Sequence, residues 1–143
     1  MPHLPLPSTT FVKDRTPRPP QGWEDVAFDD DERFAWGCDL FDAGCFFEAH
    51  ELWESCWLAA RAARGTGARS DDDTRFVHGL IRLAAAGVKL LDDKPASRLA
   101  HVKGAVDYFA GIDSAQRGIA PSTWRRAIDD LRAGRRPLLT APA

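Results

Sequence analysis

The residues with the most evident chemistry are one histidine and three carboxylates in residues 46–57, which read Phe-Phe-Glu-Ala-His-Glu-Leu-Trp-Glu-Ser-Cys-Trp. At about 100° per residue on a helix, Trp53, Trp57 and the leading phenylalanine fall on one side. His50 lies in the middle of this apolar stripe, and Glu54 follows one helical turn later. Because buried ionisable groups need partners, this stretch predicts a polar cluster buried on one helix.

The order His50-Glu51-x-x-Glu54 resembles the start of the zinc motif His-Glu-x-x-His, with a carboxylate in place of the second histidine. A carboxylate also binds metals, and helical bundles build metal sites from facing helices. His50, Glu54 and, further along the chain, His78 are therefore the candidate ligands of a divalent metal, and the sequence indicates no other cofactor. One hypothesis is a metal-dependent hydrolase, or an enzyme acting on a small polar ligand, centred on this motif.

A structural role is the second interpretation. His50 would bond to Glu54 or to a backbone carbonyl, while Arg82 pairs with Glu51 or Glu54 across a helix interface. Such an ionic cluster sets helix register without performing chemistry. Cys56 lies about two turns from His50, too far along the axis for an evident Cys–His nucleophile.

A third interpretation is a small ligand pocket. Trp53 and Trp57 would form its floor, and the guanidinium of Arg82 would match a carboxylate or phosphate on the ligand. The sequence names no ligand. We therefore favour a non-catalytic module that binds a partner or associates with itself as a homodimer, and the enzyme hypothesis stays open beside it.

Composition excludes several classes of protein. The 143 residues include 19 basic and 21 acidic side chains, and their interspersion argues against a nucleic-acid partner. No apolar run is long enough to cross a bilayer, so we expect no membrane segment. The 3 cysteines form no CxxC pair, which favours reduced thiols in a cytoplasmic protein.

Helical spacing and end signals predict an all-α fold, a single compact bundle of about five helices. Six of the ten prolines lie in residues 1–22, so residues 1–28 are expected to form an extended arm, partly docked or disordered. The helical domain is expected at 29–134 and a frayed tail at 135–143. The expected helices begin near residue 29 or 30, 45, 71, 95 and 121.

The segment 40–54, Leu-Phe-Asp-Ala-Gly-Cys-Phe-Phe-Glu-Ala-His-Glu-Leu-Trp-Glu, with Trp57 after it, resembles the signature of the Domain of Unknown Function family 309. Residues 78–84, His-Gly-Leu-Ile-Arg-Leu-Ala, are similar to the family's second block, usually Gln-Gly-Leu-Ile-Gln-Leu-Ala. A third block is similar around Gly104 and Tyr108.

This resemblance extends over about residues 29–110 and implies the fold of small bacterial and archaeal all-helical proteins. It implies no reaction. His78 and Arg82 stand where the family pattern favours glutamine, so a family site that used those amides is altered here. The resemblance marks as motif residues Glu48, His50, Glu51, Trp53 and Glu54.

Overall fold

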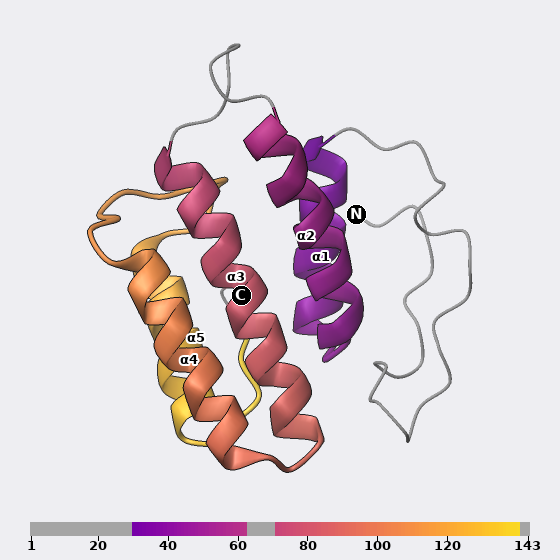
Figure 1. Cartoon of the computed structure of the whole chain (residues 1–143), viewed down its shortest axis with the longest axis vertical. Coiled ribbons are helices and arrows are strands. Elements are labelled where there is room, and N and C mark those ends of the chain that lie inside the picture. Colours follow the sequence, from indigo (N-terminus) through magenta and orange to yellow (C-terminus); the bar gives the residue numbers. More distant parts are fainter. Residues whose placement is uncertain (1–29, 63–70, 141–143) are drawn as a thin grey trace.

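The computed structural model describes residues 30–62 and 71–140 and confirms the all-α fold (Figure 1). Within these residues the structure has no strand, and its one isolated β-bridge joins Gln116 to Ile119. The expected Pro-rich arm lies outside the described residues. The helices are α1 (Asp30–Asp42), α2 (Phe46–Ala62), α3 (Asp71–Leu91), α4 (Pro95–Phe109) and α5 (Pro121–Arg132).

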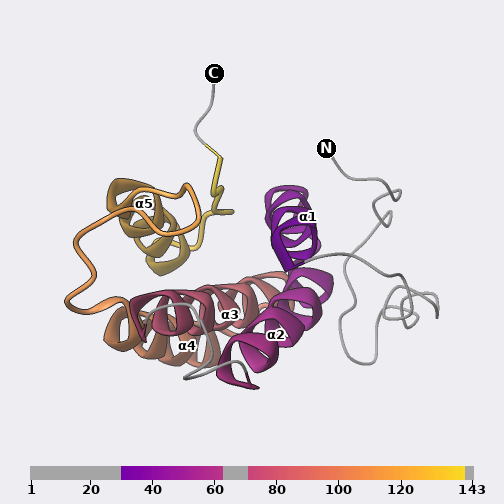
Figure 2. The same cartoon turned by 90° about the horizontal axis from the view of Figure 1, so that it is seen from above.

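The helices form two layers, seen most clearly from above (Figure 2). One layer consists of α2, α3 and α4, with α3 packed against both neighbours. The other consists of α1, which packs on α2, and α5, which packs on α3 and α4. Because α1 and α5 cover the same side of the first layer, no described helix covers its opposite side, which we call the outer side.

The two sides of α3 differ in the way that an amphipathic helix requires. Phe76 is fully buried, and its ring lies 6.2 Å from that of Phe34 on α1 and 5.2 Å from that of Trp124 on α5. The side chains at 78, 82 and 89 follow at spacings of four and seven residues, on the opposite side of the helix. This side of α3 is therefore the outer side, and its residues are partly exposed. No described helix is both long and apolar enough to cross a membrane.

Two glycines bring α2 close to its neighbours. A Cβ atom at Gly37 of α1 would lie 2.4 Å from Nε1 of Trp53, and one at Gly87 of α3 would lie 2.4 Å from the ring of Phe46. The indole of Trp53 also donates a hydrogen bond of 3.2 Å to the carbonyl of Phe34. Both large side chains of α2 are thus seated against glycine backbone, and this fixes how the helix is rotated.

A buried ion pair ties the segment between α4 and α5 to the rest of the core. Arg117 donates to both carboxylate oxygens of Asp73, at 2.8 and 3.0 Å. The two side chains are 4% and 8% exposed. The guanidinium also lies 4.8 Å from the ring centre of Phe34, so one side chain joins this segment to both α3 and α1.

The carboxylate of Asp42, at the end of α1, binds the C-terminal segment. It accepts hydrogen bonds from the backbone of Leu139 at 2.6 Å and from the backbone and hydroxyl of Thr140 at 3.2 and 2.6 Å. Leu139 is buried. The sequence predicts a frayed tail from residue 135, whereas residues 139 and 140 lie against α1, because a distant carboxylate satisfies their backbone.

Candidate functional site

The motif on α2 divides between core and surface. Ala49 and Trp53 are fully buried, whereas the side chains of His50, Glu51 and Glu54 are 27%, 49% and 50% exposed. The prediction of burial is therefore wrong for Glu54, whereas His50 is partly buried. Trp53 packs against α1, on Gly37 and the rings of Phe34 and Phe41, so the polar residues beside it are turned toward solvent.

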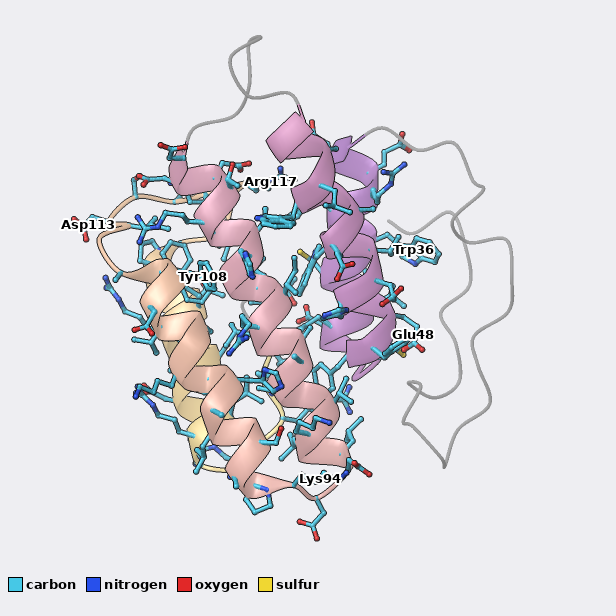
Figure 3. The ribbon with its side chains drawn as sticks, in the orientation of Figure 1. Trp36, Glu48, Lys94, Tyr108, Asp113 and Arg117 are labelled. Carbon is cyan, nitrogen blue, oxygen red and sulfur yellow. The ribbon has the colours of Figure 1, made fainter. Side chains whose placement is uncertain are left out.

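The buried acid of the motif is Glu48, which the sequence places on the far side of α2 from His50. Its side chain is 1% exposed and points away from α3 (Figure 3). Burial, together with this nearby carboxylate, raises the pKa of the Cys45 thiol to about 11. Burial likewise raises the pKa of Cys38. These two free thiols are protonated at neutral pH, which argues against thiolate nucleophiles here.

His50 has two carboxylates close by but holds neither tightly. Its Nδ1 lies 3.4 Å from Glu51 Oε1, and its Nε2 lies 3.9 Å from Glu54 Oε2. The first contact lacks hydrogen-bond geometry, so Nδ1 is buried without a hydrogen-bond partner. The ring of Phe47 stacks beside the imidazole at 6.5 Å.

Arg82 does not form the predicted pair with Glu51 or Glu54. Its guanidinium lies against α4, where a Cβ atom at Gly104 would be 2.3 Å from Nη2. Its Nε is buried without a hydrogen-bond partner, and no ion pair joins it to any described carboxylate. The prediction assumed that Arg82 points toward α2. The missing side chain of Gly104 instead gives it a path toward α4.

His101 on α4 lies in the same neighbourhood. Burial lowers its pKa, and the positive charges of Arg82, Lys89 and His50 lower it further. Its Nδ1 is also buried without a hydrogen-bond partner. Side chains from α2, α3 and α4 thus gather basic groups at one place, which we call the basic cluster: His50, Arg82, Lys89 and His101.

Aromatic contacts join the same three helices next to this cluster. His78 of α3 stacks on Tyr108 of α4 at 3.9 Å, and the ring of Trp57 of α2 meets His78 edge-on at 4.8 Å. Tyr108 is labelled on α4 in Figure 3. Trp57 is partly buried, but Trp53 lies in the core. The two tryptophans therefore do not form the floor of one pocket, as the third interpretation assumed.

The candidate metal ligands do not come together. No three His, Cys, Asp or Glu side chains within residues 30–62 and 71–140 are placed to hold a metal ion. His78, proposed from sequence as the third ligand beside His50 and Glu54, is enclosed by aromatic rings.

Sequence reasoning marked Gly104 and Tyr108 of α4 only through the family resemblance and did not single out His101. His101, Gly104 and Tyr108 recur at three- and four-residue intervals and so share one side of that helix. This spacing is the signal that could have revealed them. The apolar residues of this helix, which pack in the core, gave the stronger pattern.

The comparisons with known proteins bear on the helices that carry this site. Residues 34–99 match the model of a family described as Domain of unknown function (DUF309). The resemblance to DUF309 is confirmed. The DUF309 match includes α2 and α3 but ends before Gly104 and Tyr108, where the sequence suggested a third block. No curated protein and no solved structure matches the chain.

Proposed function

We propose that this protein is a non-catalytic binding module and that the outer side of the α2–α3–α4 layer is its binding surface. The observation that carries the proposal is the basic cluster. Three helices each contribute a side chain with a buried nitrogen that has no hydrogen-bond partner: His50, Arg82 and His101. Two of these helices lie within the DUF309 match.

Unpaired nitrogens argue against a purely structural role for the cluster. Leaving a buried donor unsatisfied costs about 1–3 kcal/mol, more than a paired one contributes. By contrast, the buried Arg117 forms an ion pair with the buried Asp73. Buried polar groups that have no hydrogen-bond partner, and so do not add to stability, are typical of binding and catalytic sites.

The arrangement favours binding over chemistry. Burial keeps the thiols of Cys38 and Cys45 protonated, and no described group of three donors is placed for a metal. The carboxylates next to His50 are half-exposed, which is unlike the enclosed setting of a general acid or base.

Thermal and urea unfolding of an Arg82→Met variant tests the proposal. Met has similar length and no charge, so we expect unfolding free energy to stay unchanged or rise by about 1 kcal/mol. Arg126→Met, on an exposed position of α5, is the control. A fall of about 3 kcal/mol or more, the cost of breaking a buried ion pair, would show that Arg82 holds the fold together instead.

The metal-dependent hydrolase is tested in parallel by elemental analysis of protein purified without chelator. We expect no stoichiometric metal. A metal present in the wild type and lost from His50→Ala would overturn the binding proposal in favour of the enzyme.

A further inference from the structure

We propose that the basic cluster binds one oxyanion group, a phosphate or a carboxylate, of a small molecule. The inference rests on the proposed binding function and names the chemistry of the ligand. Its evidence is the meeting of Arg82, Lys89 and His101 at the junction of α3 and α4, with His50 beside them on α2.

The charge around His101 is of one sign. The groups that act on its imidazole are Arg82 and Lys89 of α3 and His50 of α2, and each disfavours its protonated form. The nearest carboxylates of the cluster, Glu51 and Glu54, lie against His50 rather than against His101. The α3–α4 part of the cluster therefore has positive charge that no described carboxylate neutralises.

The available donors suit an oxyanion. An arginine fork binds phosphate or carboxylate through two parallel hydrogen bonds, and a protonated imidazole adds a charge-assisted bond. Arg82 and Lys89 have no ion pair among the described residues, and all four side chains of the cluster are partly exposed. The buried atoms themselves, Arg82 Nε and His101 Nδ1, are covered. We therefore assign the contacts to the outer atoms of these side chains.

Clustering separates these groups from other unsatisfied polar atoms. Asp39 Oδ2, Arg98 Nε and Arg117 Nη1 are also buried without a hydrogen-bond partner. Arg98, however, lies toward Gly134 after α5, and Arg117 is paired with Asp73 through its other nitrogens. An oxyanion at the cluster would contact the outer atoms of side chains from three helices at once. That is the setting in which a bound anion gains most from fixed positive charge.

The test is a titration of the full chain with inorganic phosphate, with sodium chloride holding ionic strength constant and the histidine imidazoles followed by NMR. We expect saturable shifts at His101 and His50 and a rise in the pKa of His101 when the anion is bound. A second titration with acetate distinguishes a carboxylate site from a phosphate site.

Two variants locate the site. Arg82→Gln and Lys89→Gln are each expected to weaken anion binding by about tenfold or more, the loss of one charge-assisted contact. Arg126→Gln on α5 is the matched control and should bind as the wild type does. Lys89 is only partly buried, so its variant remains informative if Arg82→Gln fails to fold.

Non-saturating shifts, or equal affinity in the wild type and both cluster variants, would overturn the anion site. The stability of Arg82→Met distinguishes failure of the anion site from failure of the proposed binding function. If Arg82→Met keeps or gains stability while neither anion binds, the cluster serves a ligand of other chemistry. If Arg82→Met loses several kcal/mol, both proposals fail together.

Discussion

Two arginines, one on each side of α3, differ in whether their positive charge has a carboxylate partner. Arg117 reaches the first turn of α3 from the segment after α4 and forms two hydrogen bonds with Asp73. Its guanidinium also lies over the ring of Phe34. Arg82, on the outer side of α3, lies against Gly104 and has neither a carboxylate nor a hydrogen-bond acceptor at its buried Nε.

Under the proposal, the difference separates a charge that stabilises the fold from one that a ligand would bind. Arg117 has a carboxylate partner within the chain, which binds its Nε and Nη2, and removing that partner would leave a buried charge uncompensated. Arg82 acts on His101 together with Lys89 and His50, and its buried Nε has no hydrogen-bond partner. Under the proposal, one side of α3 carries the ion pair that stabilises the fold, and the other side carries the ligand site.

The largest effect is expected from Asp73→Asn. It breaks the buried pair and should lower unfolding free energy by about 3–5 kcal/mol, measured by urea denaturation. Asp72→Asn is the matched control, because its pair with Arg75 spans 3.8 Å between half-exposed side chains and is expected to contribute less than about 1 kcal/mol. If both variants lost the same unfolding free energy, burial would not explain the strength of the Asp73–Arg117 pair.

A smaller effect is expected from pH at His101. Its pKa in the folded protein lies below 6.5, so between that lowered value and pH 6.5 the unfolded chain binds more protons. Stability should therefore fall as pH decreases through this interval. His101→Gln should flatten the profile, measured by urea denaturation at several pH values. An unchanged slope in the variant would contradict the basic surroundings assigned to His101.

The smallest change in stability is expected from Gly104→Ala. The new methyl group would meet the flexible end of Arg82, which can move aside, so unfolding free energy should change by less than about 1 kcal/mol. Phosphate binding should weaken, because the guanidinium is displaced from its place beside His101. Unaltered affinity would mean that this position of Arg82 does not matter for the anion.

The helices and their order could be predicted from sequence because their signals are local. Pro95 and Pro121 open α4 and α5, and aspartates open α1 and α3, where the backbone itself favours such residues. The spacing of apolar residues also identified the core side of α3, including Phe76, Leu80 and Leu83.

The partners of the polar residues could not be predicted in the same way. Asp73 reads as one of three acids at the start of a helix, yet it binds Arg117 across 44 positions of sequence. Arg82 was expected to bind the acids of α2, and the absence of a side chain at Gly104 directs it to α4 instead.

The sequence by itself determined the five helices found in residues 30–62 and 71–140. It also determined which residues of each helix are apolar and that the motif on α2 joins a histidine with carboxylates. Only the tertiary structure decided that Glu48 rather than His50 is the buried ionisable residue of the motif. It alone joined His101 to Arg82. The physical reason is that apolar packing follows helical periodicity within one segment, whereas a charge is paired or left open according to which distant residues the packed helices bring beside it.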